Sequence, residues 1–206
     1  MMPFPALSVH NVCKEFGADV RALQHIDLEV LQGETVVLIG ESGSGKTTLL
    51  RMLNGLDSPT SGEVRIHGEA LQGKDPIEVR RHIGYVQQDG GLLPHWTVEE
   101  NIGLVPLLLG RDAAQRTSRI HALLELVHLD PEKYQARYPI ELSGGERQRV
   151  TFARALAADP EIVLLDEPFG ALDAITRHEL QEQFLGLKQH LNKTMVMVTH
   201  DIDEAL

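Results

Sequence analysis

Three short apolar runs rich in β-branched residues stand out along the chain, at positions 34–40 (ETVVLIG), 161–165 and 194–199 (TMVMVT). The first ends in a glycine and precedes residues 46–53, which have helical composition, while the second runs into Asp166 and Glu167. Continuous apolar runs of this length are typical of strands that are buried on both faces, as in a parallel sheet. Because helical stretches separate them, the pattern predicts an α/β fold with a mainly parallel sheet.

A second pattern, alternation of apolar and polar residues, covers positions 7–12, 22–30 and 62–68 and predicts half-exposed strands in an antiparallel side sheet. Positions 92–158 instead show helical periods, and within 114–129 one helix face is shared by Ile120, Leu123, Leu124 and Val127. We therefore expect a single domain over residues 1–206. Its α/β core and β subdomain would comprise residues 1–91 and 159–206, and residues 92–158 would form a helical insert.

Composition and charge argue against several classes of protein, among them general nucleic-acid binders and membrane-spanning proteins. With 206 residues and 42% hydrophobic residues, the chain can bury a proper core, and its net charge of −11 argues against general adsorption to nucleic acid or to an anionic membrane. The single cysteine, Cys13, cannot form an internal disulfide, which favours a reducing, cytoplasmic compartment. The most apolar stretch, 102–109, is interrupted by Pro106 and is too short to span a bilayer, so we expect any membrane association to be peripheral.

The segment from Gly40 to Thr48 (GESGSGKTT) matches the phosphate-binding pattern G-x-x-x-x-G-K-[ST] and lies between a predicted strand and a predicted helix. Its glycines let backbone N–H groups converge on phosphates, and the N-terminus of the helix adds a favourable dipole. Lys46 would neutralise phosphate charge, and Thr47 would bind Mg²⁺. The other residues predicted to bind the nucleotide in this segment are Gly40, Ser42, Gly43, Ser44, Gly45 and Thr48.

Two acidic residues, Asp166 and Glu167, follow the second buried run directly. Ligands of open parallel sheets bind at the carboxyl ends of the strands, so both carboxylates are expected to face the phosphates. Asp166 is placed to hold Mg²⁺, and Glu167 to accept a proton from the water that attacks the γ-phosphate.

The segment 142–149 (LSGGERQR) opens another predicted helix. Ser143 with Glu146 forms a capping-box pattern, and a helix N-terminus preceded by Ser-Gly-Gly is a second anion site. One chain therefore offers two phosphate-binding helix ends but one complete set of lysine, threonine and acids. This imbalance predicts a dimer in which each nucleotide lies between the loop of one chain and the Ser-Gly-Gly segment of the other.

Taken together, these motifs resemble the ATP-binding subunit of an ABC transporter over nearly the whole chain. The resemblance implies a P-loop NTPase (RecA-like) core, ATP and Mg²⁺ as ligands, and activity as an ATPase. It makes the segment from Gly40 to Thr48 the Walker A loop, Asp166 and Glu167 the end of Walker B, and Leu142, Ser143, Gly144, Gly145 and Glu146 the signature that acts on the partner's nucleotide.

The same resemblance assigns further residues. Gln88 matches the Q-loop glutamine that senses Mg²⁺ and the attacking water, and His200 matches the switch histidine that contacts the γ-phosphate. Asp173, in GALD, resembles the D-loop aspartate. Phe16 lies where the family has an aromatic, often tyrosine, that stacks on adenine, and stacking needs no hydroxyl. Such an ATPase pairs with a second copy of itself, or with a homologous ATPase subunit, when ATP is bound. It works with an integral membrane permease and, indirectly, a substrate-binding protein, on the cytoplasmic face of the membrane.

Several stretches, at 75–86, 101–110, 129–134 and 170–177, resemble the quaternary-amine uptake branch, which imports glycine betaine, choline or carnitine. In this family the permease docks near the Q-loop, a place that residues 92–102 occupy here. Trp96, the sole tryptophan, would be either an interface anchor there or a side chain buried between helix and loop.

Two alternatives remain. The first is the ATPase of a lipoprotein-releasing or efflux ABC system. The second is an ABC-type ATPase of chromosome or DNA-repair machinery, but such proteins place a long coiled coil between Walker A and the signature, and fewer than a hundred residues without sustained heptads separate Lys46 from Ser143. No nucleic-acid partner is therefore expected.

The sequence ends at Leu206, shortly after His200 and without the terminal strands usual in the family. We therefore expect an uncovered sheet edge near residues 194–199.

Overall fold

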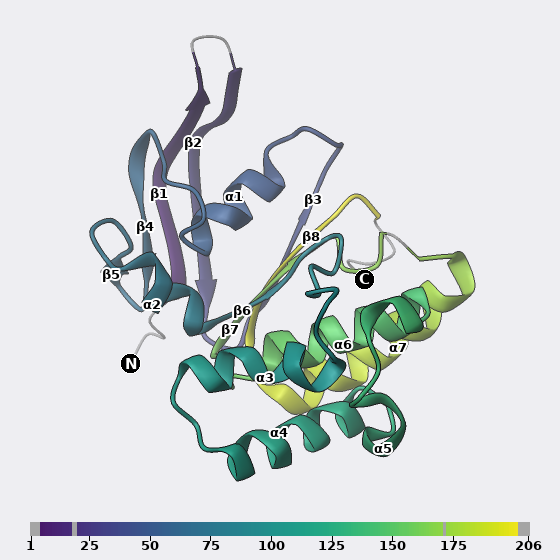
Figure 1. Ribbon diagram of the computed structural model, residues 1–206. Coiled ribbons are helices and arrows are strands. Elements are labelled where there is room, and N and C mark those ends of the chain that lie inside the picture. The colour runs from purple at the N-terminus through teal and green to yellow at the C-terminus, as the bar shows by residue number, and fades with distance from the viewer. Residues whose placement is uncertain (1–4, 18–19, 171, 202–206) are drawn as a thin grey trace.

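The computed structural model describes residues 5–17, 20–170 and 172–201, and it contains two sheets (Figure 1). The antiparallel sheet has the strand order β2-β1-β4-β5 and comprises β1 (Pro5–Phe16), β2 (Val20–Leu31), β4 (Ser61–Ile66) and β5 (Glu69–Ala70). This confirms the antiparallel side sheet that the alternating segments predict.

The second sheet is parallel and has the strand order β3-β8-β7-β6. Its strands are β3 (Thr35–Ile39), β6 (Ile83–Val86), β7 (Ile162–Asp166) and β8 (Thr194–Thr199). The three apolar runs form β3, β7 and β8, as predicted, whereas the sequence pattern did not reveal the four-residue strand β6. The prediction of an uncovered edge at β8 is wrong, because β8 is paired on both sides and all six of its residues are buried.

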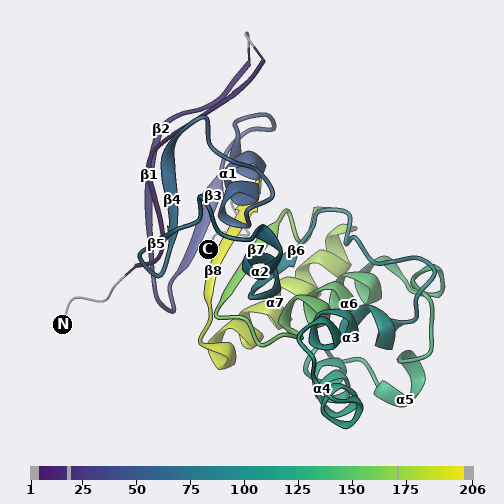
Figure 2. The ribbon, with the colours of Figure 1, turned by 60° about the vertical axis from the view of Figure 1, so that its left-hand side comes forward.

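Alternation within the parallel strands divides the apolar side chains between two cores, one on each face of the sheet. On one face, Val163, Leu165, Met195 and Met197 belong to the core shared with the long helices. On the other, Ile162, Leu164, Val196 and Val198 pack in a core with strands of the antiparallel sheet and the helix α1 (Lys46–Leu53). Figure 2 shows α1 enclosed between the two sheets.

The remaining helices lie mainly on the opposite side of the parallel sheet from α1 (Figure 2). They are α2 (Pro76–Arg81), which the sequence analysis did not predict, α3 (Val98–Leu108), α4 (Ala113–Leu126), α5 (Pro131–Tyr134), the 3₁₀ turn η1 (Pro139–Glu141), α6 (Gly144–Leu156) and α7 (Ala174–Leu191). The predicted helix face of Ile120, Leu123, Leu124 and Val127 is buried. The helices between 92 and 158 lie together with α7 (Figure 2). The rings of Phe152 in α6, Phe184 in α7 and Phe169 contact one another. Among the described residues, none of the helices combines the length and the apolar character needed to cross a membrane.

Asn101 is a fully buried polar residue that fixes the segment just before α3. Its Oδ1 accepts a hydrogen bond from the backbone of Leu93, and its Nδ2 donates to the carbonyls of Leu93, Trp96 and Thr97 over 2.9–3.1 Å. One side chain thus satisfies several backbone groups of a loop that follows Gln88 by a few residues.

We expect Asn101→Ala to lower the free energy of unfolding by about 2–4 kcal/mol, because the loop would lose four hydrogen bonds from a fully buried side chain and a cavity would remain in its place. Urea denaturation followed by circular dichroism measures the loss. The matched control is His95→Ala in the same loop, at an exposed position, which should change stability by less than about 0.5 kcal/mol. Equal stability of the two variants would show that the loop does not depend on Asn101.

Candidate functional site

The predicted phosphate loop forms the turn between β3 and α1. Gly43 and Gly45 have φ of +83° and +91°, a region that L side chains rarely adopt. A Cβ atom on Gly45 would also lie 2.4 Å from the carbonyl oxygen of Ala22 in β2, so the turn needs glycine there. All the candidate phosphate-binding residues lie in this turn or in the first turn of α1: Gly40, Ser42, Gly43, Ser44, Gly45, Lys46, Thr47 and Thr48.

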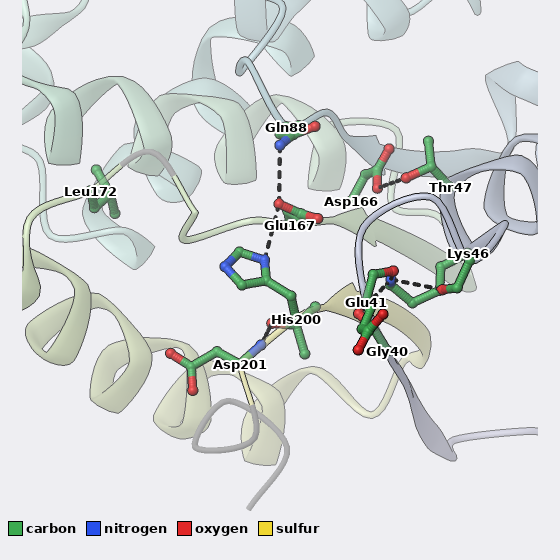
Figure 3. Close-up of polar contacts among 12 residues, drawn as sticks. Gly40, Glu41, Lys46, Thr47, Gln88, Asp166, Glu167, Leu172, His200 and Asp201 are labelled. Atoms are coloured by element: carbon green, nitrogen blue, oxygen red, sulfur yellow. Dashed lines mark hydrogen bonds and ion pairs between the residues drawn. The ribbon is translucent and has the colours of Figure 1, made fainter.

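Lys46 lies back over the loop that precedes it (Figure 3). Its Nζ donates to the carbonyl oxygens of Gly40 at 2.7 Å and Glu41 at 2.8 Å, and to Ser44 Oγ at 3.1 Å. The N-cap residue of α1 is Gly45, which supplies no capping side chain. The backbone N–H groups of the first turn therefore remain available to an anion, beside a cation held by the same loop.

Asp166, the last residue of β7, is 4% exposed, and each of its carboxylate oxygens accepts a hydrogen bond from one hydroxyl group. Thr47 Oγ1 donates to Oδ1 at 2.8 Å, and the Tyr85 hydroxyl donates to Oδ2 at 3.3 Å. Burial raises the pKa of Asp166, and these two hydrogen bonds oppose that shift. Burial and then the nearby Asp166 charge raise the pKa of Tyr85, so its hydroxyl keeps its proton and acts as a donor.

Glu167 lies between two side chains from other strand ends (Figure 3). Gln88 Nε2 donates to Glu167 Oε2 at 3.0 Å, and His200 Nδ1 lies 3.3 Å from the same oxygen. Glu167 has φ of +43°, and its backbone N–H donates to Val198 O at 2.9 Å. Because the carboxyl ends of β6, β7 and β8 meet at one edge of the sheet, residues far apart in sequence converge on one carboxylate.

The neighbouring Gln87 is directed elsewhere. Its Oε1 lies so near Gly91 that a Cβ atom on Gly91 would be 2.3 Å away, and its backbone carbonyl accepts from Gly90. The glutamine that reaches Glu167 is therefore Gln88.

The signature segment begins α6 with a reciprocal capping box. Glu146 N–H donates to Ser143 Oγ at 3.2 Å, and Ser143 N–H donates to Glu146 Oε2 at 2.7 Å. The Tyr134 hydroxyl also donates to Glu146 Oε1 at 2.6 Å, and this bond, followed by those from Ser143, lowers the pKa of Glu146. By helix geometry the N–H groups of Gly144 and Gly145 have no partner within α6, so they can bind an anion.

The signature packs against the segment that carries Asp173. A Cβ atom on Gly144 would lie 3.4 Å from Leu172 Cδ2, and one on Gly145 only 2.7 Å from Thr176 Cγ2. Asp173 Oδ1 accepts the N–H of Thr176 as the N-cap of α7. Hydrogen bonding with the Thr176 side chain, followed by this backbone bond, lowers the pKa of Asp173. Gly145 therefore allows the close approach of α6 to α7, whereas a Cβ atom on Gly144 would make an ordinary contact.

Arg177, which the sequence reasoning missed, connects this segment to the residue after His200. Its Nη2 donates to the Leu172 carbonyl at 3.0 Å, and its Nη1 lies 3.5 Å from Asp201 Oδ2. Nothing in the local sequence marks this arginine, because its contacts join segments that are distant along the chain.

Phe16 lies at the end of β1, paired with Val20 of β2. Its ring is 45% exposed and lies under Lys14 Nζ at 4.9 Å from the centroid. The strand β2 contacts the phosphate loop at Ala22, so Phe16 is on the hairpin beside that loop. The exposed ring is free to stack on a planar group.

The described contacts form two groups. Around the phosphate loop and the strand ends, Thr47 contacts Asp166, and Glu167 contacts Gln88 and His200. The signature contacts Tyr134, Leu172 and Thr176 instead. The site thus has a glycine-rich loop with a lysine, a buried acid beside a threonine hydroxyl, and a second acid in contact with a glutamine and a histidine. The start of α6 lies apart from these residues and has N–H groups without a partner in the helix.

Comparison with known proteins agrees with this geometry. The sequence profile described as "ABC transporter" matches residues 23–170. The choline transport ATP-binding protein OpuBA of Bacillus subtilis is 50% identical, over 97% of this chain and 52% of its own length. The glycine betaine/carnitine/choline transport ATP-binding protein OpuCA of the same organism is 51% identical over the same shares. This chain spans about half the length of these curated relatives.

The dimeric structure of MJ0796, a bacterial ABC transporter cassette, matches with a TM-score of 0.86 and 37% identity over 97% of this chain and 90% of that one. The profile match and these identities cover the phosphate loop, the signature and both acids. The chain therefore belongs to the ABC transporter family.

Proposed function

We propose that this chain is the ATP-hydrolysing subunit of an ABC importer for quaternary-amine osmoprotectants such as glycine betaine or choline. The observation that carries the ATP-hydrolysing role is the arrangement of Glu167 between Gln88 and His200, beside the contact of Thr47 with Asp166. A carboxylate that accepts a hydrogen bond from Gln88 and lies close to His200, next to a phosphate loop, is suited to accept a proton from a water that attacks a phosphate.

The residues at the loop fit Mg²⁺ as well as ATP. Thr47 Oγ1 and Asp166 Oδ1 are hard oxygen donors 2.8 Å apart, of the type that Mg²⁺ prefers. Among the described residues, no group of three His, Cys, Asp or Glu side chains is arranged to hold a metal, so phosphate oxygens would have to complete the coordination. When bound, Mg²⁺ would neutralise charge on the β- and γ-phosphates. Thr47 and Asp166 would hold it, with Gln88 nearby.

In the proposed reaction, ATP and water give ADP and phosphate. Backbone N–H groups from Gly43 to Thr48 and the Lys46 ammonium bind the phosphates, and the exposed ring of Phe16 stacks on adenine. Glu167 takes a proton from the attacking water as the water oxygen bonds to the γ-phosphorus and the bond to the β-phosphate oxygen breaks. His200 contacts the γ-phosphate, and Gln88 orients the water.

The signature would act on the nucleotide of a second copy. Gly144 and Gly145 offer N–H groups at the start of α6, yet the described contacts of Ser143 and Glu146 are within their own helix cap and with Tyr134. The dimeric solved relative supports an arrangement in which the signature of one chain closes over the loop of the other. Asp173 is exposed beside the signature, between Leu172 and Thr176, and would then lie at the dimer contact.

The permease would dock on the helical side. Trp96 is 36% exposed and lines a groove of about 360 Å³ between α3 and α4, together with Gly103, Leu107 and Arg116. The residues that line this groove begin at Trp96, a few positions after Gln88 in the sequence. Movement of a docked permease could therefore be transmitted to Gln88 in the nucleotide site. On this proposal the subunit works at the cytoplasmic face of the membrane, with a permease and, indirectly, a substrate-binding protein.

Uptake by cells tests the solute class, which is supported by the relatives that transport choline, carnitine and glycine betaine. Cells without the gene should take up less radiolabelled glycine betaine or choline under salt stress, and the wild-type gene should restore uptake. A Lys46→Ala gene, expressed to the same level, should not. Normal uptake of every quaternary amine tested, with a defect for another solute, would reject the solute class while leaving the ATPase intact.

A further inference from the structure

We propose that Tyr85 is a positioning residue that orients the Asp166 carboxylate toward the metal of the bound nucleotide. The proposal rests on the proposed function, because it concerns the metal that accompanies ATP. It assigns a role to a side chain that lies outside the Walker A, Walker B and signature motifs.

The sheet register places Tyr85 where it can reach Asp166. In the parallel pair β6 and β7, Tyr85 is opposite Leu164, and both side chains pack in the core that contains α1. Since side chains alternate along a strand, Asp166 shares the face of Leu164, one step nearer the carboxyl end. The Tyr85 hydroxyl therefore extends along β7 and ends 3.3 Å from Asp166 Oδ2.

The two oxygens of Asp166 are held from two sides by hydroxyls on different elements. Thr47 on α1 donates to Oδ1, and Tyr85 on β6 donates to Oδ2. A terminal carboxylate torsion is broad when it is free, and two donors on packed elements restrict it to one orientation. In that orientation Oδ1 lies at Thr47, the residue proposed to bind the metal, while Oδ2 is turned to the phenol.

A phenol is suited to this role. It supplies one donor and no charge, so it neither competes with a cation for the carboxylate nor repels the cation. Asp166 is 4% exposed, so if the Tyr85 hydroxyl were removed, water could not readily replace its hydrogen bond to the carboxylate. Phenylalanine at position 85 would keep the packing of the ring and remove the hydrogen bond alone.

Nucleotide affinity measured with and without metal tests this role. We expect Tyr85→Phe to weaken binding of a fluorescent non-hydrolysable ATP analogue in excess Mg²⁺ by roughly 10- to 100-fold, the range typical for loss of a group that orients a metal-binding side chain. Binding of the same analogue in EDTA should change less than about twofold, because the phosphate loop is intact. Tyr85→Leu, which also lacks the hydroxyl, should show the same selective loss of the metal-dependent part of affinity.

Tyr134→Phe is the matched control, since it removes another tyrosine hydroxyl from a carboxylate, that of Glu146, away from the loop. It should leave the ratio of affinities in Mg²⁺ and EDTA unchanged. An unchanged ratio in Tyr85→Phe, or equal weakening with and without metal, would overturn the positioning role. If the wild-type protein itself bound the analogue no better in Mg²⁺ than in EDTA, the proposed function would fail instead.

Discussion

Glu167→Gln should reduce the turnover of ATP by at least about 100-fold while ATP binding is retained. The amide has the shape of the carboxylate and can still accept the hydrogen bond from Gln88 Nε2, which is 3.0 Å from Glu167 Oε2 in the wild type. It cannot take a proton from the attacking water. ATP should therefore accumulate unhydrolysed in a closed dimer. Phosphate release measures the loss of turnover, and size-exclusion chromatography in the presence of ATP detects the dimer.

The matched control makes the same change at the other end of the same strand. Glu161 directly precedes β7, at the opposite edge of the sheet from the phosphate loop, and its Oε2 lies 3.2 Å from His67 Nε2. Glu161→Gln should leave turnover within about twofold of the wild type, because a surface ion pair contributes little. Unchanged turnover in purified Glu167→Gln would remove Glu167 from the role of base.

Much of the fold follows from periodicity because burial on two faces leaves a continuous apolar run. The runs that became β3, β7 and β8 are such cases, and their alternate residues do face two separate cores. β6 was missed because four residues between a helix and a loop carry too little pattern. The spatial position of β8 was also not predictable, because the order of strands in a sheet is not their order in the sequence.

In the site too, the sequence predicts local features better than contacts between distant segments. Contiguous motifs predicted the phosphate loop, the two acids and the capping box of Ser143 with Glu146, since each depends on local geometry. Tyr85 and Arg177 were missed because their partners, Asp166 and Asp201, are brought near by the packing of distant segments.

The second large effect concerns the shared site. Lys46→Ala should weaken ATP binding roughly 10- to 100-fold, because phosphate charge would lose its cation in a partly dry site. Ser143→Arg should spare binding to the loop of its own chain but place bulk and charge at the start of α6, where the partner's γ-phosphate must approach backbone N–H groups. Each variant alone should therefore be nearly inactive, for different reasons.

Mixing the two variants distinguishes a shared site from a self-contained one. In a heterodimer, both substitutions fall in the same nucleotide site. The other site then has the intact loop of the Ser143→Arg chain and the intact signature of the Lys46→Ala chain. An equimolar mixture should then recover up to about a quarter of the wild-type activity, since half of randomly formed dimers are mixed and each has one intact site. Two self-contained sites would give no recovery.

The most direct test is the specific ATPase activity of the wild-type chain across protein concentrations that sedimentation with saturating ATP shows to span monomer and dimer. If each ATP needs the loop of one chain and Ser143, Gly144 and Gly145 of another, specific activity should rise with the dimer fraction and level off when the dimer saturates. Monomers should bind ATP but hardly hydrolyse it. A specific activity that stays constant across that range would contradict the shared-site account.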